Sequence, residues 1–71
     1  MATYIVNKNP DNNGFNEIHR KNNCNHLPNP ENQITIGDFS SCSAALAHAK
    51  QTWRENKFDG CAYCCPECHT G

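Results

Sequence analysis

Toward its end the chain reads Gly60-Cys61-Ala62-Tyr63-Cys64-Cys65-Pro66-Glu67-Cys68-His69, which gathers four of its six cysteines. The first two of these cysteines form a Cys-x2-Cys knuckle that opens at the turn residues Asp59-Gly60. A knuckle of this spacing directs two sulfurs at one ion, and Zn²⁺ prefers four tetrahedral nitrogen or sulfur ligands in two close pairs. The stretch therefore predicts half of a zinc site, formed by Cys61 and Cys64.

The other half of the site is expected far upstream, in His19-Arg20-Lys21-Asn22-Asn23-Cys24. This segment offers one imidazole and one thiol where a predicted strand ends and a loop begins. We therefore predict a Zn²⁺ ion bound by His19, Cys24, Cys61 and Cys64. Four protein ligands leave no open position for water or substrate, so the predicted metal is structural.

The composition explains why so short a chain needs a metal. Leu, Ile, Val and Phe make up only 10 of the 71 residues, and a chain of this length buries only about 60 % of its unfolded surface. A structural zinc site contributes about 10–16 kcal/mol to the folding of zinc-finger peptides. The stability of a whole domain is only about 5–15 kcal/mol, so one ion suffices to offset the poor core.

The fourth ligand has alternatives. His26 could replace His19, although Cys24 and His26 lie only two residues apart, which is awkward for chelation. Cys68 or His69 could also replace His19. These three replacements stay open at this point.

Three further cysteines, Cys42, Cys65 and Cys68, have no place in this ligand set. Cys42 is expected either as a small buried hydrophobe or in a disulfide with Cys65 or Cys68 that pins the tail to the helix. Cys65-Pro66-Glu67-Cys68 has the spacing of a redox motif, but too few residues follow it to form the helix that lowers the thiol pKa in such motifs. Cys64 and Cys65 are not expected to bridge each other, because a disulfide between neighbours is strained.

Alternating and turn-forming residues predict three strands. Neighbouring side chains in residues 2–7 alternate between the two faces of a predicted strand. Asn13-Gly14 is a strong hairpin signal that leads into a return strand over residues 15–19. A third strand is predicted over residues 33–36, stopped by Gly37-Asp38. We expect these strands to form a three-stranded antiparallel sheet.

One amphipathic helix is predicted to begin at Ser40 or Ser41, either of which can cap it. Its inward residues recur at helical spacing and are Cys42, Leu46, Ala49 and Trp53. The sequence therefore predicts an α+β fold in which residues 1–71 form a single zinc-stabilised domain.

The order of these features resembles the Ada-type metal-binding domain, the small zinc module of DNA alkylation repair proteins. The residues that carry the resemblance lie between about positions 4 and 64: Asn7, His19, Cys24, Glu31 to Ile36, Phe39-Ser40-Ser41, Ala44-Ala45 and Gly60-Cys61-x2-Cys64. In that family four cysteines bind zinc, and the first thiolate accepts a methyl group from a DNA phosphotriester. His19 stands at that position here, and the spacing is one residue longer. The resemblance therefore implies a related zinc fold that does not perform the methyl transfer.

Charge and composition limit the classes of function that this chain can have. Six Lys and Arg against seven Asp and Glu give a formal net charge of −1, which provides no positive field for non-specific binding of nucleic acid. We expect a non-catalytic zinc module that contacts a protein partner as an adaptor or inhibitor. The alternatives are a module that contacts nucleic acid through Arg20 and Lys21 beside the metal, and a thiol redox or methyl-acceptor protein.

The sequence also bears on the compartment. No apolar run approaches the roughly 18 residues of a membrane span, and residues 1–8 lack the features of a signal peptide. We expect a cytoplasmic protein, where reduced cysteines more often bind metal than form disulfides. A disulfide framework is the alternative if a signal has been removed.

Overall fold

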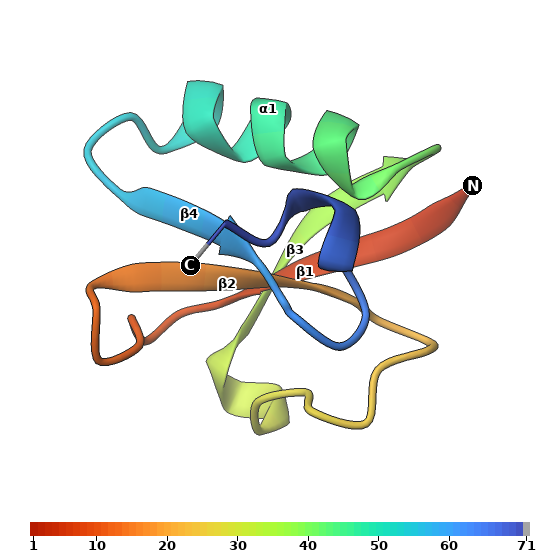
Figure 1. Cartoon of the computed structure of the whole chain (residues 1–71), viewed down its shortest axis with the longest axis horizontal. Coiled ribbons are helices and arrows are strands. Elements are labelled where there is room, and N and C mark those ends of the chain that lie inside the picture. Colours follow the sequence, from red (N-terminus) through yellow and green to blue (C-terminus); the bar gives the residue numbers. More distant parts are fainter. Residues whose placement is uncertain (71) are drawn as a thin grey trace.

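The computed structural model describes residues 1–70 as an α+β fold, with one helix packed on a four-stranded sheet (Figure 1). The strands lie side by side in the order β3-β1-β2-β4. The elements in chain order are β1 (Ala2–Asn7), β2 (Phe15–Arg20), the 3₁₀ turn η1 (Pro30–Asn32), β3 (Gln33–Phe39), α1 (Cys42–Thr52), β4 (Lys57–Gly60) and the 3₁₀ turn η2 (Pro66–Cys68).

The hairpin of β1 and β2 confirms the prediction from the turn residues. The two strands pair antiparallel, with Val6 opposite Ile18. In the turn, Asp11 Oδ1 accepts hydrogen bonds from the backbone N–H groups of Asn13 and Phe15, each at 2.9 Å. Gly14 adopts a positive φ of 86°, which a residue with a side chain rarely takes.

The predicted three-stranded antiparallel sheet is wrong, because a fourth strand is present. β4 pairs parallel with β2, with Ile18 beside Gly60, so the sheet is mixed. Asp59-Gly60, predicted to form a tight turn, is instead part of this strand. Its Phe58 is buried in the core. Four residues with one large apolar side chain give little local signal, and the parallel partner lies some forty residues upstream.

The third strand is longer than predicted. It continues through Gly37-Asp38 to Phe39 and pairs antiparallel with β1, with a register shift between Tyr4 and Ile5. Gly37 has a φ of 142°, in the range that favours glycine. Glycine therefore lets the strand pass through an irregularity here, where the sequence predicts a stop.

The helix begins as predicted after Ser41, whose hydroxyl accepts a hydrogen bond from the backbone N–H of Ala44 at 3.3 Å. The side chains of the helix and its C-cap that pack on the sheet are Cys42, Ala45, Leu46, Ala49 and Trp53. All four predicted inward residues are among them, and Ala45 is the addition. None of the helices in the described part of the chain is long and apolar enough to cross a membrane.

The sheet buries side chains on both faces. Tyr4, Val6 and Ile18 belong to the core beneath α1. Ile5 alternates with Tyr4 and Val6 and pairs with His19, yet Ile5 and His19 are only 1 % and 2 % exposed. Figure 1 shows the segment from the end of β2 to η1 on the side of the sheet away from α1. The segment between β2 and η1 therefore covers the second face of the sheet, where the predicted ligand His19 lies.

Gly60, at the end of β4, supports the packing of the tail. A Cβ atom at this position would lie 2.6 Å from Cys68 Sγ and 2.7 Å from the backbone oxygen of Cys65. We expect Gly60→Ala to lower the free energy of unfolding by about 3 kcal/mol, the upper part of the usual range for overpacking. Thermal unfolding followed by circular dichroism measures this change.

Gly14→Ala is the matched control, since a Cβ atom there would meet nothing within 4 Å. It should cost only the strain of a positive φ, about 1–2 kcal/mol. If the two variants melt at the same temperature, the close approach of the tail to Gly60 does not contribute to stability.

Candidate metal centre

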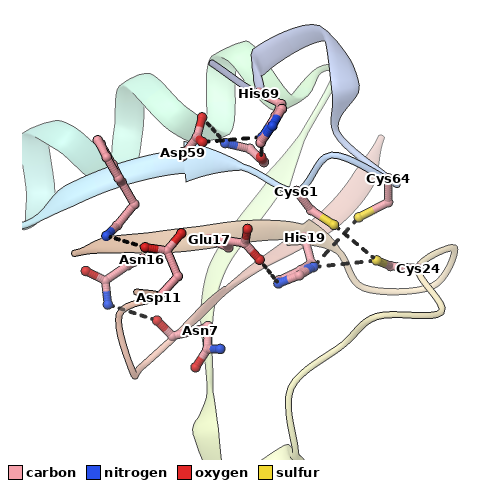
Figure 2. Close-up of polar contacts among 12 residues, drawn as sticks. Asn7, Asp11, Asn16, Glu17, His19, Cys24, Asp59, Cys61, Cys64 and His69 are labelled. Carbon is pink, nitrogen blue, oxygen red and sulfur yellow. Dashed lines mark hydrogen bonds and ion pairs between the residues drawn. The ribbon is translucent and has the colours of Figure 1, made fainter. Parts of the chain in front are cut away.

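Four side chains from distant parts of the chain meet on the second face of the sheet. The ligand atoms of His19, Cys24, Cys61 and Cys64 all lie within 4.8 Å of one another (Figure 2). His19 comes from β2, Cys24 from the loop after it, and the other two cysteines from the turn that follows β4. The structure thus brings together the four residues that the sequence predicts as metal ligands.

The parallel pairing of β2 with β4 explains this meeting. Because Ile18 lies beside Gly60, the next residues along the two strands, His19 within β2 and Cys61 directly after β4, come close together. The backbone N–H of Cys61 continues the ladder by donating to the Ile18 carbonyl at 2.9 Å. The strand that the sequence analysis missed is therefore the element that positions the Cys-x2-Cys knuckle.

Three of the six distances between the ligand atoms lie close to the edges of a tetrahedron around zinc. With Zn–S of about 2.3 Å and Zn–N of about 2.0–2.1 Å, tetrahedral geometry requires about 3.8 Å between two sulfurs and about 3.6 Å between sulfur and nitrogen. Cys24 Sγ lies 3.8 Å from Cys61 Sγ and 3.5 Å from His19 Nδ1. Cys64 Sγ lies 3.9 Å from the same nitrogen.

Neighbouring groups hold the ligands in place. The backbone N–H of Arg20 points at Cys64 Sγ at 3.3 Å, a contact that favours the thiolate. The backbone N–H of Cys65 donates to the Cys61 carbonyl at 2.8 Å and closes the turn between the two cysteines. On the far side of the imidazole, His19 Nε2 faces Glu17 Oε1 at 3.8 Å (Figure 2). This arrangement directs Nδ1 toward the three sulfurs.

Burial favours the neutral forms of the His19 imidazole and the Cys64 thiol when no cation is present. It lowers the pKa of the His19 imidazole, with a smaller effect from His26. Burial also raises the pKa of the Cys64 thiol, and the hydrogen bond with Cys24 adds to the rise. A bound divalent cation reverses the preference of the thiols, since a coordinating thiol loses its proton.

The alternative fourth ligands lie elsewhere. The His26 ring stacks on Tyr63 at 3.8 Å between centroids, and both side chains are exposed. His69 Nδ1 lies 2.9 Å from the Gly60 carbonyl oxygen and 3.3 Å from Asp59 Oδ2. Cys68 belongs to a separate cluster. Neither histidine is part of a metal-ligating cluster in the described residues.

That separate cluster lies under the start of α1. Its ligand atoms, also within 4.8 Å of one another, belong to Cys42, Cys65, Glu67 and Cys68. Of the two disulfides that the sequence leaves open for Cys42, the structure has the one with Cys68. The sequence analysis gave Glu67 no role, although its place inside the second Cys-x2-Cys was a usable signal.

Comparisons with known proteins give no relative: no family model, no curated protein and no solved structure matches this chain. The resemblance to Ada-type domains therefore rests on the residues and spacings quoted above. What the chain does has to be argued from the chemistry of its own clusters.

Glu17 provides a test of the metal centre. In Glu17→Gln the carboxylate that faces His19 Nε2 becomes a neutral amide, so the imidazole becomes a weaker ligand. We expect the affinity for zinc to fall about tenfold, the lower end of the usual effect of such partners, in competition with a chromophoric chelator. Glu55→Gln, at an exposed position, is the control, and an equal effect of both variants would contradict the assignment.

Proposed function

We propose that this chain is a small, non-catalytic zinc-binding module whose ion, held by His19, Cys24, Cys61 and Cys64, is structural. The observation that carries the proposal is the convergence of these four ligand atoms within 4.8 Å of one another, with three of the distances close to tetrahedral spacing. An N–H···S or S–H···N hydrogen bond joins two groups, whereas a shared cation accounts for all four at once.

The donor set favours zinc over other common divalent metals. Three thiols and one imidazole suit Zn²⁺, whereas Mg²⁺ and Ca²⁺ prefer oxygen ligands. The pattern of Cys₃His also belongs to the ligand sets of structural zinc sites, which keep no position open for water. Such a closed site stabilises a fold and activates no nucleophile, in line with a protein that is not an enzyme.

The ion would join segments that lie far apart in the sequence. It links the end of β2 and the loop after it to the turn after β4, on the face of the sheet opposite α1. Ile5 is the large aliphatic side chain buried beside His19 on this face, and hydrophobic packing is sparse in a chain with 10 Leu, Ile, Val and Phe residues. The metal therefore takes the place of a second hydrophobic layer.

A protein partner is the binding role that the exposed surface supports best. Tyr63 lies between the two cysteines of the knuckle and is 72 % exposed, and its ring stacks on His26 with an angle of 21° between the planes. The metal ion bound by Cys61 and Cys64 would hold the aromatic ring between them in a fixed position. Exposed, pre-positioned tyrosines are typical anchors of protein–protein interfaces.

Removal of the metal tests the proposal. Because a structural zinc ion contributes about 10 kcal/mol or more, we expect Cys61→Ser to leave the protein unfolded, and a strong chelator to unfold the wild type. Circular dichroism and elemental analysis for zinc measure both effects.

Cys65→Ser is the matched control, since Cys65 lies outside this ligand set; it should stay folded and keep a zinc ion. A folded Cys61→Ser protein, or wild-type protein that retains its spectrum without metal, would contradict the structural role.

Nucleic-acid contact through Arg20 and Lys21 remains the second candidate, and the structure provides little for it. The Arg20 guanidinium lies 5.9 Å from the centre of the Tyr4 ring, and its Nη2 lies 3.4 Å from the Tyr4 hydroxyl oxygen. This packing directs the cation toward the protein and leaves Lys21 as the exposed charge of the pair.

We therefore expect no electrophoretic shift of a DNA duplex at low salt. Binding through phosphates weakens steeply as salt is raised, so the same assay at a second salt concentration identifies it. A shift at low salt that disappears at high salt would contradict the proposal of a protein partner and favour nucleic acid.

A further inference from the structure

We propose that Cys42, Cys65, Cys68 and Glu67 form a second zinc site in the reduced protein, and that the Cys42–Cys68 disulfide is the alternative state of the same cluster. This site is separate from the first and does not depend on it. The zinc content of the protein would then report its redox state, with two ions when the cluster is reduced and one when it is oxidised.

The ligand atoms of this cluster gather within the same distance limit as those of the first one. The three sulfurs and a carboxylate oxygen lie within 4.8 Å of one another. Cys42 comes from the first turn of α1, and the other residues come from the tail and η2. Cys42, Cys65 and Cys68 are all buried, whereas Glu67 reaches in from the surface.

The sequence repeats the same ligand spacing. Cys65-Pro66-Glu67-Cys68 directly follows Cys61-Ala62-Tyr63-Cys64, so two Cys-x2-Cys units stand in tandem. The neighbours Cys64 and Cys65 belong to different clusters. The backbone N–H of Cys68 donates to the Cys65 carbonyl at 3.1 Å, which folds the second unit into a turn. Each unit therefore supplies two sulfurs to a cluster of its own.

A metal ion accounts for all members of the cluster, and a disulfide for only two. The disulfide uses Cys42 and Cys68 and gives no role to the buried thiol of Cys65. Glu67 Oε1 lies 2.9 Å from Cys42 Sγ, the distance of a hydrogen bond from a thiol, and a disulfide sulfur has no proton to donate. The carboxylate is thus placed for the reduced state, where it completes a donor set of three thiolates and one oxygen that suits zinc.

Two features favour negative charge at this point. Cys42 is the first residue of α1, where the unpaired backbone N–H groups of a helix stabilise a thiolate. Burial has the largest effect on the Cys65 thiol and raises its pKa, whereas the positive charge of Arg20 lowers it.

The exchange between the two states balances as follows. A small dithiol reduces the Cys42–Cys68 bond with two electrons and two protons, giving two protein thiols and the oxidised reductant. Zn²⁺ then binds Cys42, Cys65 and Cys68 as thiolates, and their three protons pass to the solvent. Oxidation by a small disulfide runs in reverse, with release of the ion.

Native mass spectrometry of the full chain tests the proposal directly. Zinc-loaded protein is prepared with a dithiol reductant and, separately, with a small disulfide as oxidant, and each sample is dialysed to remove loosely bound metal. We expect two zinc ions in the reduced protein. The oxidised protein should hold one ion. Its polypeptide, measured without metal, should be lighter than the reduced polypeptide by two hydrogen atoms. A single ion in the reduced protein that Cys65→Ser also retains would overturn the second site.

Substitutions assign the second ion without disturbing the first. Under reducing conditions Cys65→Ser should bind one zinc ion, and Glu67→Gln should bind the second ion at least tenfold more weakly. Glu31→Gln, at an exposed position outside both clusters, is the matched control and should keep two. Two tightly bound ions in Cys65→Ser would place the second ion elsewhere and overturn the proposal. Failure of the first site has a different signature, since zinc would then be absent from Cys65→Ser.

Discussion

Three thiols and one imidazole share a single point where two parallel strands end, and the rest of the structure depends on this meeting. Parallel pairing of β2 with β4 brings His19 beside Cys61. The same pairing is short, because β4 contains only four residues. A shared cation would therefore hold together a contact that backbone hydrogen bonds alone support weakly, and it would fix the end of the sheet.

The two faces of the sheet are stabilised in different ways. Under α1 the chain packs a conventional core around Tyr4, Ile18 and Phe58, with small alanines on the helix. On the opposite face the buried imidazole of His19 takes the place of a large apolar side chain. The tail serves both faces, since the neighbours Cys64 and Cys65 contribute to different clusters. This division explains how 71 residues with so few aliphatic side chains form a folded unit.

Local signals in the sequence predicted much of the fold. The turn chemistry of Asn13-Gly14 indicated the hairpin, and Ser41 indicated the start of the helix, because caps and turns depend on a few neighbouring residues. The strand at Lys57–Gly60 was missed because its parallel partner lies far away in the sequence and its own signal is one buried phenylalanine. The extension of β3 through Gly37 was missed because a glycine that ends a strand looks the same in sequence as one that bends it.

The candidate ligands were predictable for a different reason. Thiols and imidazoles at short spacings are rare enough that two pairs indicate one site, even with 36 residues between them. The spacing does not show which of two neighbouring cysteines belongs to which cluster, as for Cys64 and Cys65. It also gave no role to Glu67, since a single carboxylate between cysteines becomes a candidate ligand only when the fold brings Cys42 against it.

X-ray absorption at the zinc edge tests the central claim most directly. The sample is the Cys65→Ser protein with one equivalent of zinc, so that the first cluster alone provides a complete ligand set. We predict a shell of three sulfur atoms at about 2.3 Å and one nitrogen at about 2.0–2.1 Å. A shell dominated by oxygen and nitrogen, or one of four sulfurs, would contradict the assignment of His19, Cys24, Cys61 and Cys64.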